Sequence, residues 1–399
     1  MKDVVIIANF SQVPGENGND RFAYLAKLLK DDCRIELITS SFHHKSKKQR
    51  EKHCETVDSR FITTTVYEPG YPKNICFKRF YSHWIWGKNV RKYLKSRTKP
   101  DVIYCAVPSL TGPLAVAKYC KRNDVKFIVD IQDLWPEAFK MVFKVPVISD
   151  LIFAPFNWIA NGIYKRADEI VAVSDTYVKR ALRVNKKCKQ GHTVFLGTQL
   201  KTFDENVRNN PVEKPEVELW LGYCGTLGAS YDITCVLDAL AIVKERGLVP
   251  PKFMVMGDGP RRAEFENYAK GKNVNAVFTG RLPYDQMCGR LNACDIAVNP
   301  ITHGAAQSII NKHGDYAMSG LPVLNTQECE EYRNLVSSYD MGYNCNNDNA
   351  EDLADKLIYL LQNDAERARM GKNARKCAEE KFDRKNNYKE IISLVLREE

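Results

Sequence analysis

Apolar residues along the first half of the chain form short continuous runs, and segments with a helical repeat separate these runs. Residues 4–8 and 102–106 are runs of this kind, as expected for strands that are covered on both faces of a sheet. Strands that alternate with helices form parallel sheets, so the pattern predicts a doubly wound α/β domain. The predicted strands are residues 4–8, 34–39, 102–106 and 127–131, and the predicted helices are residues 20–30 and 112–122.

The same pattern restarts in the second half, after a polar segment at residues 201–218. This segment contains Asn209, Asn210 and Pro211, which favour turns, so we expect it to be a linker. The restart predicts a second parallel sheet. Its predicted strands are residues 219–224, 252–256, 277–279 and 296–299, and its predicted helices are residues 233–246, 261–269 and 284–291.

The length of 399 residues is too great for a single core and predicts two or three domains. Combined with the restarted pattern, it predicts two Rossmann-like domains with a cleft between them. We place the first domain at residues 1–200 and the second at residues 201–380, followed by a final segment at residues 381–399.

The formal net charge of +10 is distributed unevenly along the chain. Residues 1–200 contain 34 Lys and Arg against 19 Asp and Glu, whereas residues 201–399 contain 25 against 30. A basic first half indicates an anionic partner, either nucleic acid or an anionic membrane surface. No acid lies between Glu68 and Asp101.

The cysteines and the N-terminal residues indicate the cellular compartment in which the protein is expected. The 13 cysteines include no C-x-x-C pair, which favours reduced thiols in the cytoplasm and argues against structural zinc. The sequence opens on a predicted strand, without the pattern of a signal peptide, and no apolar run is long enough to span a bilayer. We therefore expect a cytoplasmic protein.

Residues 71–99 combine nine Lys or Arg with seven aromatic residues. This composition fits an interfacial helix whose aromatics lie at the level of the lipid headgroups while its cations meet anionic lipid. The apolar segment at residues 139–158 would extend that surface. Two alternatives stay open: the aromatic residues belong to the core, or the strip binds nucleic acid by stacking and phosphate contact.

The segment from Gln307 to Val323 has the composition of an anion site. If a helix begins near Asp315, then Lys312 and His313 lie at its N-terminus, where backbone N–H groups and the helix dipole favour a diphosphate. An ordinary amphipathic helix that is ended by Gly320 and carries Lys312 as a surface charge is the alternative.

Three glycine turns follow predicted strands. They contain Gly18, the pair Gly225 and Gly228, and the pair Gly257 and Gly259. Such turns let backbone amides approach phosphate groups, although tight turns or helix caps explain each of them equally well. Taken together they indicate a ligand at the carboxyl ends of the strands, where open α/β sheets bind their ligands.

Two further segments bear polar groups, one suited to a phosphate and the other to a sugar. Arg281 follows a predicted strand, and its guanidinium can bind a phosphate through two hydrogen bonds. Asp133, Trp135 and Glu137 follow another strand, and carboxylates with an indole face suit a sugar, although a helix start at Pro136 is the simpler alternative. Motifs for metal or serine-nucleophile chemistry are missing from the sequence, so no metal is expected.

The segments 225–228, 256–259, 280–283, 295–300 and 315–323 resemble, in order and spacing, the donor-domain signatures of family-four retaining glycosyltransferases. The segment 133–137 resembles the sub-group that builds bacterial capsule and O-antigen, which includes N-acetylfucosamine transferases. The resemblance implies a GT-B fold, a UDP-sugar held mainly by the second domain, an acceptor held by the first, and a C-terminal helix that crosses back onto the first domain.

The chain departs from the family pattern at several positions. Gln307 and Asp315 replace two glutamates, and Thr226 and Tyr231 stand where many members place diphosphate-binding cations. Lys312 and Arg281 are the candidate replacements that stabilise the leaving diphosphate, and Asp133 is the candidate for part of the role of the family's cleft histidine. The resemblance implies donor contacts at Gly18, Gly225, Thr226, Leu227, Gly228, Gly257, Asp258, Gly259, Leu282, Gln307, Ser308 and Asp315, and acceptor contacts at Trp135 and Glu137.

The resemblance implies transfer of a hexose or N-acetylated sugar from a UDP-sugar to a lipid-linked saccharide, with retention of anomeric configuration and without a cofactor. Binding to the inner face of the cell membrane through residues 71–99 accompanies this hypothesis, and nucleic acid is not the expected partner. A nucleotide-sugar 2-epimerase on the same fold and a UDP-sugar-binding subunit with weak catalysis are the alternatives.

Overall fold

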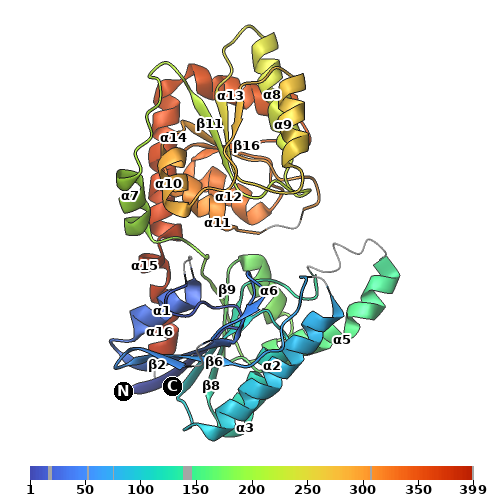
Figure 1. Ribbon diagram of the computed structural model, residues 1–399, viewed down its shortest axis with the longest axis vertical. Helices are drawn as coiled ribbons and strands as arrows, with labels where there is room; N and C mark the ends of the chain where they lie inside the picture. The colour runs from blue at the N-terminus through green and yellow to red at the C-terminus, as the bar shows by residue number, and fades with distance from the viewer. Residues whose placement is uncertain (17–19, 52–53, 75, 138–145, 306–307, 398–399) are drawn as a thin grey trace. The chain divides into compact units, whose positions relative to one another are not determined.

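The computed structural model describes residues 1–16, 20–51, 54–74, 76–137, 146–305 and 308–397. The chain forms two compact units: unit 1 comprises Met1–Phe195 and Tyr388–Glu399, and unit 2 comprises Leu196–Asn387 (Figure 1). Each unit has its own sheet and core, and the α/β fold predicted from the sequence is confirmed. The boundaries between the units lie after residues 195 and 387, whereas the sequence predicted boundaries after residues 200 and 380.

The sheet of unit 1 has the strand order β10-β9-β8-β7-β1-β2-β6-β5. All neighbouring strands are parallel except β5 and β6, which are antiparallel. The central strands are apolar throughout because helices cover both faces of the sheet. The strands are β1 (Lys2–Ile7), β2 (Cys33–Ser40), β5 (Cys54–Asp58), β6 (Phe61–Val66), β7 (Val102–Val107), β8 (Lys126–Ile131), β9 (Glu169–Ala172) and β10 (His192–Thr193).

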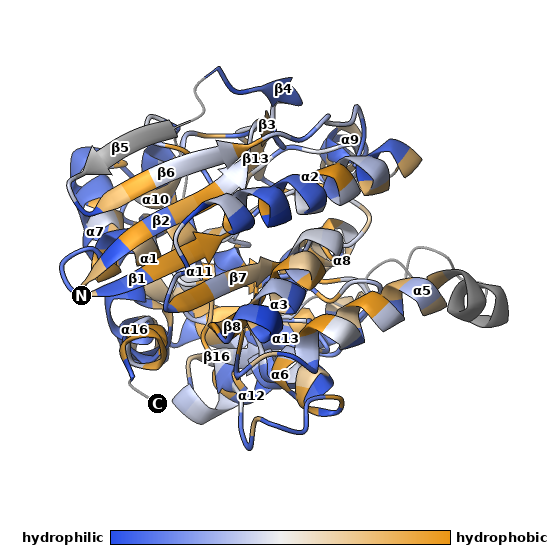
Figure 2. Ribbon diagram, turned by 90° about the horizontal axis from the view of Figure 1, so that it is seen from below, coloured by the Kyte–Doolittle hydropathy of each residue, from blue (hydrophilic) through white to orange (hydrophobic). Residues whose placement is uncertain are grey.

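Each face of this sheet is covered by its own hydrophobic cluster. One cluster packs α2, α3, α5 and α6 on one face, and the other packs α1 and the C-terminal helix α16 on the opposite face. Helices α2, α3 and α5 lie side by side (Figures 1 and 2). The helices are α1 (Arg21–Leu29), α2 (Phe77–Ser96), α3 (Thr111–Asn123), α5 (Pro146–Tyr164), α6 (Asp175–Leu182) and α16 (Lys389–Leu396).

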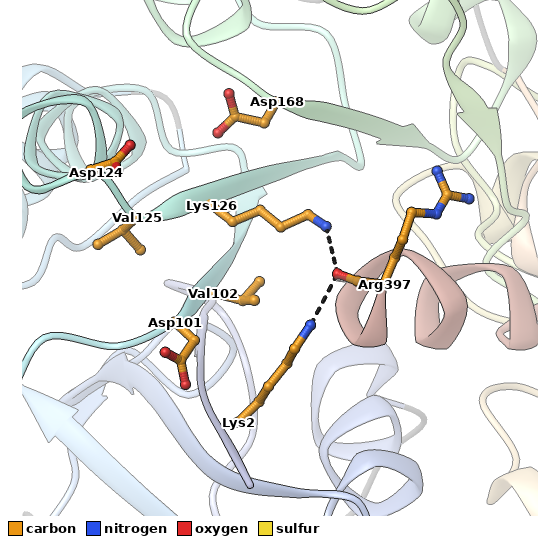
Figure 3. Close-up of a pocket in the computed structure, with 8 residues that line it drawn as sticks. All are labelled: Lys2, Asp101, Val102, Asp124, Val125, Lys126, Asp168 and Arg397. Carbon is orange, nitrogen blue, oxygen red and sulfur yellow. Dashed lines mark hydrogen bonds between the residues drawn. The ribbon is translucent and has the colours of Figure 1, made fainter. Parts of the chain in front are cut away.

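The C-terminal end of α16 is capped by two lysines at the amino-terminal edge of this sheet. Lys2 Nζ donates to the carbonyls of Leu396 at 2.8 Å and Arg397 at 2.9 Å, and Lys126 Nζ donates to Arg397 at 3.2 Å (Figure 3). Cations at a helix C-terminus satisfy carbonyls that have no partner within the helix. The pocket of about 350 Å³ that these residues line therefore lies at the opposite edge from the strand ends where α/β sheets bind ligands.

A short hairpin follows β2 in unit 1. Its strands β3 (Phe42–His43) and β4 (Lys48–Gln49) pair antiparallel and place residues 44–47 in the connecting turn. Arg50, just after β4, lies 2.8 Å from Glu16 and is largely buried. This basic part of the sequence is therefore folded onto unit 1.

The sheet of unit 2 is entirely parallel and has the order β13-β12-β11-β14-β15-β16. Strand order reverses between β11 and β14, so the topological switch point lies between these two strands. The strands are β11 (Trp220–Cys224), β12 (Lys252–Met256), β13 (Ala276–Phe278), β14 (Ile296–Asn299), β15 (Val323–Asn325) and β16 (Gly342–Asn344). The helices are α7 (Leu200–Asn209), α8 (Ile233–Glu245), α9 (Arg262–Gly271), α10 (Tyr284–Asn292), α11 (Asn311–Met318), α12 (Glu330–Tyr339), α13 (Ala350–Gln362), α14 (Asp364–Cys377) and α15 (Arg384–Asn387), with a π-helical turn at Ala378–Phe382.

The linker predicted at residues 201–218 is wrong over its first half, because Leu200–Asn209 form the helix α7. Phe203 is fully buried on this helix, and α7 packs against α10. The contact is close: a Cβ atom on Gly289 would lie 1.9 Å from the carbonyl oxygen of Asn210. The segment therefore belongs to the body of unit 2.

Among the helices of the described ranges, none is both long and apolar enough to span a membrane. The same part of the chain contains no group of three or more His, Cys, Asp or Glu placed to hold a metal ion.

Candidate active site

The candidate site lies in unit 2 at the carboxyl ends of β11 and β14. The turn at residues 225–228 follows β11, and α11 follows β14, so both segments start at the topological switch point. Helix α11 begins at Asn311, earlier than predicted, and Lys312 lies in its first turn. The two segments singled out by the sequence therefore meet.

Lys312 is held against the glycine turn by aromatic rings. Its Nζ atom lies 4.2 Å from the ring centre of Tyr223 and 4.0 Å from that of Tyr231. A Cβ atom on Gly225 would lie 2.7 Å from this Nζ, so a side chain at that position would displace the lysine. Gly225 also has a φ of +141°, which side chains rarely adopt. The glycine is required by both its conformation and its neighbour.

The ammonium of Lys312 is buried without a hydrogen-bond partner among the described residues, and only 7% of the residue is exposed. Burial lowers the pKa of Lys312 to about 7, while the charges of Cys224 and Asp315 oppose this shift. A lowered pKa combined with unused N–H groups is the expected state of a lysine that awaits an anion.

Asp315 lies one turn after Lys312 and is engaged by hydroxyl groups. The Tyr284 hydroxyl donates to Asp315 Oδ1 at 2.8 Å, and Thr198 Oγ1 donates to the same oxygen at 3.4 Å. Burial raises the pKa of Asp315 to about 6, and these hydrogen bonds limit the rise. The carboxyl group thus accepts hydrogen bonds from hydroxyls, which are also the groups that a ribose presents.

The turn after β12 packs backbone against backbone on the turn after β11. A Cβ atom would lie 1.8 Å from the Gly225 oxygen if built on Gly257, and 2.3 Å from the Leu227 oxygen if built on Gly259. The amide of Gly225 donates to Met256 at 3.0 Å, and that of Leu227 donates to Asp258 at 2.9 Å. Close packing therefore accounts for Gly257 and Gly259 without a ligand.

The amides of the first turn alternate in their hydrogen bonding. Those of Gly225 and Leu227 are used in the contact with the second turn, whereas those of Thr226 and Gly228 have no partner within the described part of the chain. The side chain of Leu227 is fully buried and that of Thr226 is exposed. Thr226 and Gly228 are accordingly the turn residues whose amides are available to a ligand.

The other predicted donor residues of unit 2 are more loosely placed. Asp258 is exposed and accepts from the following amide at 2.8 Å. Arg281 is exposed and makes no hydrogen bond or ion pair with the described residues, and Leu282 beside it is half-buried. Ser308 is half-buried, and its carbonyl accepts from Gln327 Nε2 at 2.9 Å. Gln307 and Gly18 lie outside the described residues.

A buried amide network, which the sequence did not reveal, holds the strand ends beneath α11. Asn299 Nδ2 donates to Asn325 Oδ1 at 2.9 Å and to Gln327 Oε1 at 3.1 Å. His313 stacks on Tyr332 with ring centres 3.5 Å apart. Asn299 Nδ2 also lies 3.2 Å from His313 Nε2 in the first turn of α11, which connects this network to the start of the helix.

In unit 1 the predicted acceptor residues lie just beyond β8. Trp135 Nε1 donates to Asp133 Oδ2 at 3.2 Å, and burial raises the pKa of Asp133. Trp135 is 5% exposed and belongs to the core, and Glu137 pairs with Arg180 on α6. The indole is therefore fixed by packing rather than presented as an open platform.

Asp130, which lies in β8 shortly before these residues, has a structural role. Arg21 Nε donates to Asp130 Oδ2 at 2.7 Å, and the Tyr104 hydroxyl donates to the same oxygen at 2.6 Å. Both members of this ion pair are buried, and the Arg21 guanidinium also lies 4.7 Å from the ring centre of Tyr388 on the C-terminal segment.

Sequence reasoning missed the aromatic partners of the site. Tyr223 was taken only as the end of a strand and Tyr231 only as a departure from the family pattern, yet both flank Lys312. Tyr284, taken as a helix start, contacts Asp315. The sequence signal that could have indicated these partners was the presence of tyrosines at the ends of strands and the starts of helices beside a glycine turn.

Comparison with known families covers both units. Residues 204–377 match the family described as glycosyl transferases group 1, and residues 21–194 match the family described as Glycosyltransferase Family 4. A search of curated proteins found no match.

Solved structures show the same fold. Sucrose-phosphate synthase from Thermosynechococcus elongatus has a TM-score of 0.74 at 14% identity, over 99% of this chain and 98% of that one. HepE from Anabaena in complex with UDP has a TM-score of 0.67 at 13% identity, over 98% and 99%. WaaG, a glycosyltransferase involved in lipopolysaccharide biosynthesis, has a TM-score of 0.64 at 15% identity, over 99% and 100%.

The fold and the two family matches define a GT-B enzyme. The protein is a glycosyltransferase, with unit 2 matching the group 1 model and unit 1 matching the family 4 model.

Proposed function

We propose that this glycosyltransferase moves a hexose or an N-acetylated sugar from a UDP-sugar to a lipid-linked saccharide, with retention, in the synthesis of a capsule or O-antigen polysaccharide. The observation that carries the proposal is Lys312, a buried ammonium with unused N–H groups at the switch point of unit 2. HepE, which has the same fold, was solved in complex with UDP and with UDP-glucose, and WaaG acts in lipopolysaccharide biosynthesis.

In the proposed reaction, unit 2 binds the donor. Lys312 and the free amides of Thr226 and Gly228 contact the diphosphate, and Asp315 accepts hydrogen bonds from the ribose hydroxyls. The bond from the anomeric carbon to the diphosphate oxygen breaks, and a bond from that carbon to the acceptor oxygen forms on the same face. The acceptor hydroxyl proton passes to the departing phosphate oxygen, whose charge Lys312 stabilises. Arg281 is exposed and can add a second cation to the diphosphate.

The test compares the wild type with Lys312→Ala and with Lys270→Ala, which removes an exposed lysine of α9 as a control. UDP release is measured with a panel of UDP-sugars and a lipid-linked saccharide acceptor. We expect Lys312→Ala to lower turnover at least about tenfold, because a cation that stabilises the leaving group is lost, while the melting temperature is retained.

Equal turnover in Lys312→Ala would remove this residue from the mechanism. Conversion of the donor without release of UDP would instead indicate an epimerase, and UDP-sugar binding without turnover on any acceptor would indicate a binding subunit.

The acceptor lipid places the protein at a membrane, and α2 offers a surface for it. Phe77, Tyr81 and Trp84 are exposed at helical spacing and continue into Lys88 and Arg91 on the same stripe. Phe77 is 93% exposed and Trp84 is 47% exposed. Exposed aromatics followed by cations match the requirements of an interface with anionic lipid.

Two observations refine this surface. Trp86, which the sequence placed in the same strip, is 1% exposed and belongs to the core, so the alternative of a core residue holds at this position. Trp158 is 84% exposed and adds an aromatic residue from α5, which lies on the same face of the sheet as α2. Figure 2 shows apolar residues along much of the described part of α5.

Vesicle co-sedimentation tests the surface with phosphatidylglycerol and with phosphatidylcholine. The triple variant with Lys88, Lys92 and Lys95 changed to Gln is expected to lose about 3 kcal/mol of binding to anionic vesicles, at about 1 kcal/mol for each cation. The matched control replaces the exposed lysines Lys270, Lys372 and Lys376 of unit 2. Equal binding of both triple variants would remove α2 from the membrane surface.

A further inference from the structure

A second group of cations lies in unit 1, beyond the carboxyl ends of its strands. Arg79 is in the first turn of α2 and is only 9% exposed. Its guanidinium carbon lies 4.6 Å from the ring centre of Trp135, 5.4 Å from that of Tyr71 and 5.7 Å from that of Phe10. These three residues follow β8, β6 and β1, so the rings converge on the edge where parallel sheets bind ligands.

The β3–β4 hairpin adds a second cation to the same rings. Lys47 Nζ lies 4.8 Å from the ring centre of Tyr71 and donates to Asn74 Oδ1 at 2.6 Å. His44 Nδ1 lies 2.6 Å from the Tyr71 hydroxyl and 3.3 Å from Lys47 Nζ. Lys47 is half-buried and Asn74 is exposed, so this group of residues extends to the protein surface. We call Arg79, Lys47, His44, Tyr71 and Trp135 the Arg79 cluster.

No carboxylate neutralises the two cations of the Arg79 cluster. Residues 69–100 contain no acid, and among the described residues no carboxylate lies within ion-pair distance of Arg79 or Lys47. Glu68 and Asp133 act on Arg79 only at longer range. Glu68 is buried and already accepts hydrogen bonds from Ser40 at 2.6 Å, Ser82 at 2.8 Å and Asn9 at 3.1 Å.

The donors of the Arg79 cluster are incompletely used. Arg79 Nε is buried and has no hydrogen-bond partner among the described residues, and the same is true of Nε2 of the adjacent His83. Burial lowers the pKa of Arg79, and burial together with repulsion by Arg79 lowers the pKa of Lys47. Helix α2 also begins without a capping side chain and without an acid in its first turn. A dianion would relieve each of these features.

We propose that the Arg79 cluster binds a phosphate or diphosphate ester carried by the acceptor. This assignment rests on the proposed transfer reaction, because it names the group by which unit 1 holds the acceptor. The guanidinium and the ammonium contact the phosphate oxygens, since both cations lie against the Tyr71 ring. The two sources of such an ester are a lipid diphosphate and a soluble sugar phosphate.

Isothermal titration calorimetry with inorganic diphosphate tests the site. The full-length protein is first saturated with UDP, so that the donor site is occupied. We expect Arg79→Gln and Lys47→Gln each to weaken diphosphate binding at least about tenfold, because each removes one charge-assisted contact. The control Lys78→Gln, which removes the exposed cation next to Arg79 in the sequence, should bind like the wild type.

If Arg79→Gln fails to fold, Lys47→Gln decides the question, because the Lys47 side chain is partly exposed. Equal diphosphate affinity in the wild type and in Lys47→Gln would overturn the proposal, as would the absence of diphosphate binding to the wild type.

A competition experiment identifies which kind of phosphate ester the Arg79 cluster binds. Displacement of diphosphate by farnesyl diphosphate but not by glucose 6-phosphate assigns the site to a lipid diphosphate, and the reverse result assigns it to a sugar phosphate. Displacement by neither compound would overturn the assignment to an acceptor ester. The saturating UDP titration separates this result from the proposed function: a protein that does not bind UDP refutes the donor assignment, whatever its diphosphate affinity.

Discussion

Replacing Lys312 with Met tests whether this lysine takes up a proton when UDP binds at the donor site. In the free protein the pKa of Lys312 is about 7, because burial disfavours the ammonium and no hydrogen bond from a described residue supports it. A diphosphate beside Nζ would favour the charged form and return the pKa to well above 8. Binding of UDP should therefore draw a proton from solution.

The size of this uptake follows from the pKa. At pH 8 a group with a pKa of about 7 is protonated in about one molecule in ten, so full protonation on binding takes up about 0.9 proton. Neighbouring groups contribute little at this pH, because Asp315, with a pKa of about 6, is already ionised and Cys224, with a pKa of about 12, stays protonated.

Calorimetric titration of UDP in three buffers of different ionisation enthalpy measures the uptake directly. We expect about 0.9 proton for the wild type and for the control Lys270→Met, and close to zero for Lys312→Met. If the Lys312 variant binds too weakly to titrate, the wild-type dissociation constant itself should rise nearly tenfold from pH 8 to pH 9. Uptake below about 0.3 proton in the wild type, or equal uptake in the Lys312 variant, would refute the reasoning.

Three further changes probe the fold and the site. Asp130→Asn leaves Arg21 buried without its charged partner, and denaturant unfolding of unit 1 should show a loss of about 3–5 kcal/mol; a loss below about 1 kcal/mol would contradict this. Gly257→Ala places a Cβ atom 1.8 Å from the Gly225 oxygen, so calorimetry should show UDP binding weakened about tenfold or more with circular dichroism unchanged. Burial raises the pKa of Asp315 from 3.8 to about 6, so ionisation of this residue lowers stability as pH rises through about 6. Asp315→Asn should therefore raise the unfolding free energy at pH 8 by up to about 3 kcal/mol, and an equal difference at pH 4 would exclude this cause.

The central strands of both sheets could be predicted because most of them are continuous apolar runs, whereas shorter or more polar strands, such as β6, β9, β15 and β16, were not predicted. Val4–Ile7 and Val102–Val107 bury every side chain, and only a doubly covered parallel strand tolerates such a run. Helix α7 was missed although Leu200, Phe203 and Val207 are placed at helical spacing, because the turn-forming residues Asn209, Asn210 and Pro211 that follow it were given more weight.

The candidate site was predictable where it depends on strand ends. Lys312 and Gly225 are far apart in sequence, yet each follows a strand next to the switch point, so topology alone brings them together. The rings of Tyr223 and Tyr231 around the ammonium depend on side-chain packing, which sequence pattern does not specify. The contact between the hairpin residue Lys47 and Tyr71 is equally non-local, and no sequence pattern indicated it.

Lys312 and Arg79 show one physical arrangement in two units. Each cation lies in the first turn of a helix that starts beyond the carboxyl end of a parallel sheet, and each rests against aromatic rings. A carboxylate partner would neutralise such a cation and would have to be displaced when a phosphate binds. An aromatic ring stabilises the cation through its quadrupole and accepts none of its strong hydrogen bonds, so the N–H groups stay available. For a transfer between two phosphorylated substrates, as proposed here, both units would thus hold cations whose binding capacity is kept for the ligand, at the expense of a less favourable charge in the free protein.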